Sequence, residues 1–529
     1  MPVVFLLAGV PRPAAAQPAD DEPLDITIRT DEGETTISRH IYGHFAEHLG
    51  RDIYGGFWVQ RGQGSSGEGA GRPGAGQPDG PPGGWQYNED VIEALRRIDI
   101  PNLRWPGGCF ADYYHWRDGV GPKDERPPVV NTLWGGAVED NSFGTHEFMG
   151  LARRLGTEPI VVGNVGSGQP EEMANWWQYV NGSKESPMGQ LRAQNGHPEP
   201  WSVKYWGVGN ESWGCGGNMT PSYYADLYKR FATFLRPAGG TEPFRVATGP
   251  SGDNYEWTRT LMKEAGGMID GLDLHYYTIT GTWADKGSAT DFNRDEWFSS
   301  MESAFYIDEL VTRHSAIMDE HDPENNTALI VGEWGLWHDR KPGTKSGFLY
   351  QQNTLRDAVV AAIHLNVFNR HADRVKMANI AQTVNVLQAM ILTKGDEMIL
   401  TPTYHVFDMY KAHQDATLLP MEWEQGAYRR DEKKVPAISA SASMGDDGAV
   451  HLTVANVDPA EGRTVTTTLD GTPVSDVSGR ILTADAMDAR NTFENPDALE
   501  PTSFTGAALE GATLTLDLPP KSVVALELE

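Results

Sequence analysis

Short apolar runs alternate with longer amphipathic segments between about residue 40 and residue 400. Short runs bounded by Gly, Pro or polar clusters are typical of buried strands, and longer segments with a helical apolar period are typical of helices. We predict strands over residues 41–45, 102–105, 160–163, 205–209, 245–248, 271–275, 328–332 and 377–382. The helices predicted between them span residues 88–98, 144–155, 171–180, 223–235, 254–265, 301–319 and 354–370.

This alternation predicts an α/β fold, because strands that alternate with helices usually form a parallel sheet with crossover helices. Eight strands with helices between them favour a closed (β/α)8 TIM barrel, which we place at residues 36–400. One helix start is clearly marked, since Thr220 is a suitable cap and Pro221 suits a first helical position.

The pattern changes after about residue 400, where apolar and polar residues alternate with a period of two. Residues 449–455 and 512–518 are examples, and Asp-Gly and Pro-rich turns separate such runs. That period is typical of strands with one buried face. We therefore predict a C-terminal all-β sandwich, jelly-roll-like, over residues 401–529. Residues 24–35 also alternate, and we expect them to add an N-terminal strand to this sandwich.

Two segments fall outside these patterns. Residues 1–16 contain a short apolar run and end in the small residues that a signal peptidase requires, so we expect a signal peptide and a secreted or periplasmic protein. No Lys or Arg precedes the run, and without a signal peptide the protein would be cytoplasmic. Residues 61–84 are mostly Gly, Pro, Gln and Ser, which predicts a flexible surface loop.

Composition narrows the class of partner. The formal net charge of −30 would repel nucleic acid and anionic membrane surfaces, so a neutral partner such as a sugar fits better. No stretch approaches the roughly 20 apolar residues of a membrane helix. The oligomeric state stays open, with a homo-oligomer as one option. Cys109 and Cys215 are too few for a disulfide framework; one bridge between them and two free thiols are both compatible with the sequence.

Two glutamates stand where a barrel places its chemistry, at the C-terminal ends of strands. Glu211 ends the fourth apolar run and Glu333 ends the seventh, so the two lie across the barrel mouth from one another. Acetal hydrolysis needs a proton donor and a carboxylate on the opposite face of the sugar, about 5–5.5 Å apart for retention. A single glutamate at a strand end often only caps the next helix, but the joint placement favours a glycosidase pair.

Further polar residues follow the other strands. His275 and Tyr277 point to the same side of an extended chain and are placed to hydrogen-bond a nucleophile or a sugar. Arg104 closes the second run before a Trp-Pro-Gly-Gly turn whose glycines permit close approach to a ligand. Glu47 is placed to hold sugar hydroxyls, with a solvated carboxylate as the alternative. No metal-ligand motif is present, so we predict neither a metal nor a cofactor.

At these residues the sequence resembles glycoside hydrolase family 51, the retaining α-L-arabinofuranosidases. The resemblance runs from about residue 25 to the end of the chain. The motifs that carry it are Ile41-Tyr-Gly-His-Phe-Ala-Glu-His-Leu-Gly-Arg, Arg104-Trp-Pro-Gly-Gly-Cys, Trp134-Gly-Gly-Ala-Val-Glu-Asp-Asn-Ser-Phe-Gly-Thr-His-Glu-Phe, Tyr205-Trp-Gly-Val-Gly-Asn-Glu-Ser-Trp-Gly, Asn491-Thr-Phe-Glu-Asn-Pro and Leu518-Pro-Pro-Lys-Ser-Val-Val.

The resemblance implies a role for each matching residue. It makes Glu211 the general acid/base and Glu333 the nucleophile, with Tyr277 orienting Glu333. It makes Asn210 the partner of the sugar 2-hydroxyl. The residues that it places around the arabinose are Glu47, Cys109, His275 and Gln382, with Trp134 as an aromatic wall.

The implied activity is the exo-acting removal of terminal non-reducing α-L-arabinofuranosyl units. Arabinan, arabinoxylan and oligosaccharides derived from them are the expected partners. A β-glycanase or β-xylosidase on the same barrel is the alternative among enzymes, since it would use the same two glutamates. A non-catalytic carbohydrate-binding protein is the alternative outside them, but it has no need of both carboxylates.

Overall fold

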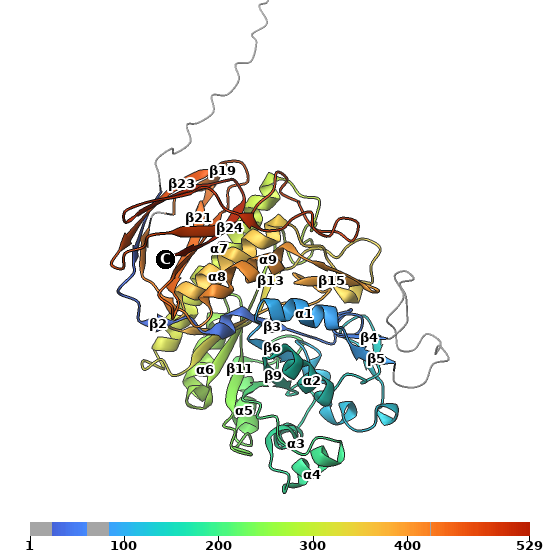
Figure 1. Cartoon of the computed structure of the whole chain (residues 1–529). Helices are drawn as coiled ribbons and strands as arrows, with labels where there is room; N and C mark the ends of the chain where they lie inside the picture. Colours follow the sequence, from blue (N-terminus) through green and yellow to red (C-terminus); the bar gives the residue numbers. More distant parts are fainter. Residues whose placement is uncertain (1–23, 61–83, 424) are drawn as a thin grey trace, which may run out of the picture.

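The computed structural model describes residues 24–60, 84–423 and 425–529 (Figure 1). The predicted signal peptide, residues 1–16, and nearly all of the predicted Gly-rich loop, residues 61–83, lie outside the described residues. Within the described ranges, no helix is long and apolar enough to cross a membrane.

Eight parallel strands close into a barrel, and the predicted TIM-like fold is confirmed. Every neighbouring pair around the ring is parallel. The strands are largely buried because helices cover the outside and side chains fill the inside. In ring order they are β3 (Gly43–Phe45), β6 (Asn102–Trp105), β9 (Glu158–Gly163), β10 (Tyr205–Val208), β11 (Phe244–Ser251), β12 (Gly271–Thr278), β13 (Ala328–Leu336) and β14 (Val375–Ile380).

The helices match the predicted segments with differences at their ends. The structure has α1 (Glu89–Arg97), α2 (Thr145–Leu155), α3 (Pro170–Asn181), α4 (Pro187–Gln194), α5 (Pro221–Ala232), α6 (Tyr255–Ala265), α7 (Arg294–Asp319), α8 (Leu355–Arg370) and α9 (Pro402–Tyr410). The start predicted for α7 at residue 301 was wrong: Asn293 and Glu296 form a capping box that begins the helix earlier.

Two helices were not predicted. The first, α4, has little amphipathic character, and only the cap at Ser186 followed by Pro187 marks its start. The second, α9, lies in the segment expected to be all-β, and it is buried on nearly every side. A helix buried all round shows no amphipathic stripe, so periodicity cannot reveal it.

Two mainly antiparallel sheets form the C-terminal strand-rich part and pack beside α8 (Figure 1). Their inner faces enclose a second apolar core. β1 (Leu24–Arg29) pairs antiparallel with β18 (Met421–Trp423) and parallel with β23 (Arg463–Asp470), so the N-terminal segment contributes a strand here. The domain limits at residues 36–400 and 401–529 stay a prediction.

The strands of these sheets are mostly short. One sheet has the order β2 (Thr35–Thr36), β17 (Thr417–Leu418), β21 (Ile438–Met444), β22 (Val450–Asn456), β28 (Ser522–Leu528), β24 (Val477–Leu482) and β25 (Thr502–Ser503). The other has the order β18 (Met421–Trp423), β1, β23 (Arg463–Asp470), β27 (Thr513–Leu518) and β26 (Ala507–Glu510).

Four antiparallel strand pairs lie outside the barrel and the two larger sheets. They pair β4 (Trp58–Gln60) with β5 (Trp85–Tyr87), β7 (Val129–Asn131) with β8 (Ala137–Glu139), β15 (Ile391–Lys394) with β16 (Glu397–Leu400), and β19 (Tyr428–Arg430) with β20 (Lys433–Val435) among the described residues.

Candidate active site

A cavity of about 500 Å³ opens at the C-terminal ends of the barrel strands. Arg104 and Asn210 lie behind the lining of this cavity. Arg104 donates hydrogen bonds to Glu333, which lines the cavity, and to Asn210. The other predicted site residues line the cavity: Glu47, Cys109, Trp134, Glu211, His275, Tyr277, Glu333 and Gln382. The structure therefore brings together all the side chains that the sequence singled out.

Glu333 lies within β13 and is held by hydrogen bonds to both carboxylate oxygens. The Arg104 guanidinium donates to Oε1 at 2.9 Å, and the Tyr277 hydroxyl donates to Oε2 at 2.7 Å. The Glu333 side chain is only 6 % exposed. Hydrogen bonds to both oxygens hold this carboxylate in one orientation.

Glu211 follows β10 in a different setting. Its backbone is in the left-handed region with φ of 41°, which turns its side chain into the cavity. His275 Nδ1 lies 3.0 Å from Oε1. Carboxylate oxygens of Glu211 and Glu333 lie within 4.8 Å of one another, together with a ring nitrogen of His275. The two carboxyl groups therefore flank one small volume.

The surroundings shift the pKa values of Glu211 and His275. Burial raises the pKa of Glu211, and the negative charge of Glu333 raises it further, although the contact with His275 opposes the shift. Burial alone would lower the pKa of His275, but Glu333 and Asp273 outweigh it and raise that pKa to about 10. His275 is therefore a cation at neutral pH and donates from both ring nitrogens, with Nε2 3.2 Å from Asp273 Oδ2.

Glu47 lines the cavity together with Trp134 and Gln382. Trp134 Nε1 donates to Oε1 at 2.9 Å, and Gln382 Nε2 donates to Oε2 at 2.7 Å. Burial, followed by the charge of Glu333, raises the pKa of Glu47 to about 7. The side-chain oxygen of Gln382 is buried without a partner among the described residues. This part of the cavity thus offers an acceptor to a hydroxyl-rich ligand.

The glycines of the turn after β6 sit against these carboxylates. A methyl group at Gly108 would lie 3.0 Å from Glu333 Oε1 and 3.3 Å from Glu47 Oε2. Gly107, with φ of 159°, would meet Glu47 Cγ at 2.6 Å. The glycines were predicted to allow close approach to a ligand; in the structure they allow close approach to the carboxylates that form the cavity.

Buried polar groups that the sequence did not single out support the site from behind. Asp112 accepts hydrogen bonds from the backbone N–H groups of Val165, Gly166 and Asn210. Asp273 accepts from the Gly332 N–H as well as contacting His275. These carboxylates join neighbouring strand ends, a role that becomes visible only when the strands are assembled.

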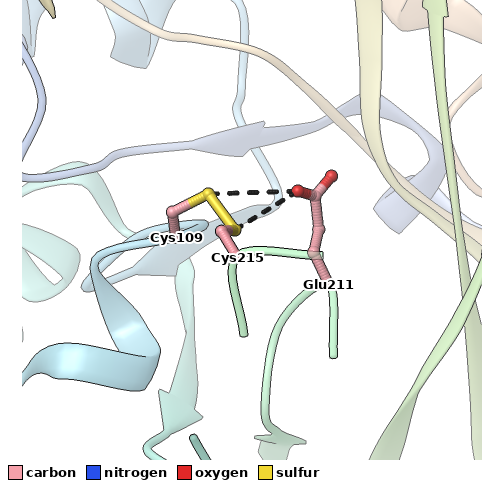
Figure 2. Close-up of side chains that lie close together, drawn as sticks. All are labelled: Cys109, Glu211 and Cys215. Carbon is pink, nitrogen blue, oxygen red and sulfur yellow. Dashed lines mark hydrogen bonds between the residues drawn. A yellow bond between two sulfur atoms is a disulfide. The ribbon is translucent and has the colours of Figure 1, made fainter. Parts of the chain in front are cut away.

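Cys109 and Cys215 form a disulfide beside Glu211 (Figure 2). Both sulfurs face Oε2 of this glutamate, at 3.4 Å for Cys215 and 3.9 Å for Cys109. The bridge links the turn after β6 to the turn after β10, over a sequence separation of 106. Of the two options left open by the sequence, the structure contains the bridge.

Three tryptophans of the cavity were missed, and so was Tyr276. Trp213, Trp283 and Trp337 line the cavity, and they lie in loops where no period marks them. Trp283 is 61 % exposed and meets Trp337 edge-on with 5.5 Å between ring centroids. The available signal was a tryptophan in a loop close to a strand end, where barrels of this kind carry their sites.

Two groups of side chains have the spacing of metal ligands among the described residues: Cys109, Glu211 and Cys215, and Glu211, His275 and Glu333. The sulfurs of the first group are consumed in the disulfide. In the second group, His275 already contacts Glu211 through Nδ1 and Asp273 through Nε2. The expectation of no metal stays a prediction.

Family models match much of the chain. A model described as the α-L-arabinofuranosidase 1 domain matches residues 94–295, and one described as the α-L-arabinofuranosidase C-terminal domain matches residues 332–522. The chain is 50% identical over 505 residues to an intracellular exo-α-L-arabinofuranosidase from Bacteroides ovatus, covering 95% of each chain. It is 31% identical to α-L-arabinofuranosidase C from Emericella nidulans, covering 88% of this chain and 91% of the relative.

Solved structures agree with these matches. A GH51 arabinofuranosidase from Xanthomonas axonopodis pv. citri superposes with a TM-score of 0.90 at 47% identity, covering 96% of this chain and 100% of the other. An α-L-arabinofuranosidase from Thermotoga maritima, solved as an arabinose complex, gives a TM-score of 0.80 at 30% identity, covering 95% and 99%. A bifunctional glucanase-xylanase at 13% identity shares the fold alone.

Proposed function

This chain belongs to the α-L-arabinofuranosidases of glycoside hydrolase family 51, and from that premise we propose that it works by double displacement with retention. Glu333 attacks the anomeric carbon while Glu211 gives its proton to the departing oxygen. The first step leaves an arabinosyl ester on Glu333. In the second step Glu211 takes a proton from water, which releases arabinose with its original configuration.

The separation of the two carboxylates carries this proposal. One oxygen of each lies within 4.8 Å of the other, which is nearer the roughly 5–5.5 Å of retaining enzymes than the roughly 6.5–9.5 Å of inverting enzymes. The environments also fit the two roles. Glu333 is paired with Arg104, and the raised pKa of Glu211 keeps a proton available.

We further propose how one arabinosyl unit is held. Glu47 and Gln382 accept and donate hydrogen bonds to ring hydroxyls, with Trp134 as the adjoining wall. Asn210, whose Oδ1 accepts from Arg104 at 2.5 Å, is proposed to contact the 2-hydroxyl. The cavity of about 500 Å³ has room for an arabinosyl unit, and we propose exo action on arabinan, arabinoxylan and their oligosaccharides.

A panel of nitrophenyl glycosides tests the proposed specificity. Release of nitrophenol is expected from p-nitrophenyl α-L-arabinofuranoside, with at most weak release from the β-D-xylopyranoside and β-D-glucopyranoside. Proton NMR of the first-formed sugar then reports the configuration. Preferred cleavage of either β-glycoside would favour the β-xylosidase or β-glycanase alternative, and a first product of opposite configuration would contradict retention.

Tyr277→Phe is expected to slow the enzyme without unfolding it, because the Tyr277 hydroxyl donates directly to Glu333 Oε2. A hydrogen bond to a charged group contributes about 1.5–3 kcal/mol, so kcat/KM should fall roughly 10- to 100-fold. Tyr276→Phe is the matched control: Tyr276 also lines the cavity, but its hydroxyl donates to the carbonyl of Ser303, which does not. Equal losses in both variants would contradict an orienting role for Tyr277.

Trp283→Ala is expected to weaken binding of the part of the substrate beyond the scissile bond. Its exposed ring, packed on Trp337 at the mouth of the cavity, offers a face for sugar stacking. A loss of about 0.5–1.5 kcal/mol should raise KM for arabinoxylo-oligosaccharides two- to tenfold and leave p-nitrophenyl arabinofuranoside nearly unchanged. Phe234→Ala removes an exposed ring that does not line the cavity and serves as the control. An equal effect on both substrates would argue against this role.

Secretion, expected from residues 1–16, finds no support. That segment lies outside the described residues, and the Bacteroides ovatus relative is named intracellular. The name is compatible with the cytoplasmic alternative. Oligomerisation stays a prediction.

A further inference from the structure

The two oxygens of the Glu211 carboxylate have different neighbours. His275 Nδ1 lies 3.0 Å from Oε1, so this oxygen accepts a hydrogen bond. The sulfurs of Cys215 and Cys109 lie 3.4 Å and 3.9 Å from Oε2 (Figure 2). Because Oε1 is engaged, the acid proton belongs on Oε2, which is the oxygen beside the sulfurs.

The oxidation state of the two sulfurs decides what they can do to that oxygen. A disulfide sulfur carries no hydrogen, so the bridge presents Oε2 with a surface that cannot donate. Each free thiol has one S–H and is a weak donor. Donation to a carboxylate stabilises its charged form and lowers its pKa. Reduction would therefore place up to two donors against the oxygen that has to carry the acid proton.

The bridge also fixes the backbone that presents Glu211. The Glu211 carbonyl accepts hydrogen bonds from the N–H groups of Gly214 and Gly216, so Cys215 lies inside the turn that holds the left-handed Glu211. Cys109 directly follows Gly108, where an added methyl group would lie 3.0 Å from Glu333 Oε1. The disulfide thus ties the turn that carries the proposed acid to the turn that packs on the proposed nucleophile.

Other charged or titratable groups around Glu211 do not share this sensitivity. The chain has only two cysteines, so a disulfide reductant has one target. The groups that face Glu211 from the neighbouring strands are Arg104 on β6, His275 and Tyr277 on β12, and Glu333 on β13.

We propose that Cys109 and Cys215 form a redox-responsive positioning pair that sets how well Glu211 delivers its proton. This proposal rests on the proposed acid role of Glu211. A dithiol supplies two electrons and two protons: the S–S bond breaks, two S–H bonds form, and the dithiol leaves as its cyclic disulfide. The oxidised enzyme retains a protonated Glu211 to higher pH, and the reduced enzyme loses it earlier.

The test compares the air-oxidised full-length enzyme with the same sample after dithiothreitol. Thiol titration should give no free thiols before reduction and two after it. Profiles of kcat/KM against pH are then recorded for two substrates. Methyl α-L-arabinofuranoside has a poor leaving group that needs a proton, and 2,4-dinitrophenyl α-L-arabinofuranoside has a leaving group that departs without one. The alkaline limb for the methyl glycoside should move down by about half a pH unit on reduction, and the profile for the dinitrophenyl glycoside should not move.

Two double variants separate donation from tethering. Cys109→Ala with Cys215→Ala removes both donors, and Cys109→Ser with Cys215→Ser supplies permanent hydroxyl donors. Circular dichroism shows whether both variants are folded. In the folded variants, the alkaline limb of the kcat/KM profile should occur at lower pH for the serine variant than for the alanine variant. Neither variant should respond to dithiothreitol.

Three outcomes would overturn the proposal: two free thiols in the air-oxidised enzyme, superimposable methyl-glycoside profiles before and after reduction, or equal losses on both substrates. Failure of the proposed acid role looks different. In that case Glu211→Ala would affect both leaving groups equally, whatever the redox state.

Discussion

The kcat/KM of Glu333→Ala is expected to fall by about four orders of magnitude or more, because the variant lacks the nucleophile that attacks the anomeric carbon. Glu333 is the carboxylate that Arg104 and Tyr277 fix from two sides. Glu47 also faces the cavity, but its oxygens are held by Trp134, Gln382 and the Phe110 N–H. Hydrolysis of p-nitrophenyl α-L-arabinofuranoside measures the loss.

Azide should restore turnover of the alanine variant, since a small anion fits where the side chain was and attacks from the same face. The product is then an arabinosyl azide of inverted configuration, which NMR identifies. Glu47→Ala is the matched control: it also removes a buried carboxylate from the cavity, yet it should yield no azide adduct. An adduct from the Glu47 variant, or activity of Glu333→Ala near that of the wild type, would refute the nucleophile assignment.

The barrel was predictable because its signal is local. Each strand is a short buried run between polar or glycine-rich ends, and eight such runs leave few other arrangements. Strand ends also carry the chemistry in this fold, so Glu211 and Glu333 could be selected before any contact was known. The cap at Thr220, which accepts from the Tyr223 N–H, was equally readable.

What escaped prediction depends on the assembled fold. The helix α9 is buried on nearly all sides and so shows no stripe. Arg104 had a plausible place in the sequence, but its two partners, Glu333 and Asn210, come from strands far away in the chain. The bridge between Cys109 and Cys215 likewise depends on two turns meeting. Long-range geometry of this kind has no signature in local patterns.

Glu211→Ala is expected to discriminate between leaving groups. A sugar alcohol needs a proton to depart, and a phenol of low pKa does not, so the variant should lose roughly 10²- to 10⁴-fold on arabino-oligosaccharides and far less on the p-nitrophenyl glycoside in kcat/KM. Glu211→Gln, which keeps the shape and the contact with His275, should show the same pattern. Equal losses on both substrates would contradict the acid role.

The pH profile of this variant gives the sharper test. Burial and the charge of Glu333 raise the pKa of Glu211, and an acid with a raised pKa stays protonated at higher pH. Wild-type activity on oligosaccharides should therefore be present below the pKa of Glu211 and fall as pH rises through it. Removing Glu211 should abolish the alkaline limb of kcat/KM. If that limb persisted, another group would have to supply the proton, and neither the turn after β10 nor its disulfide would govern the acid step.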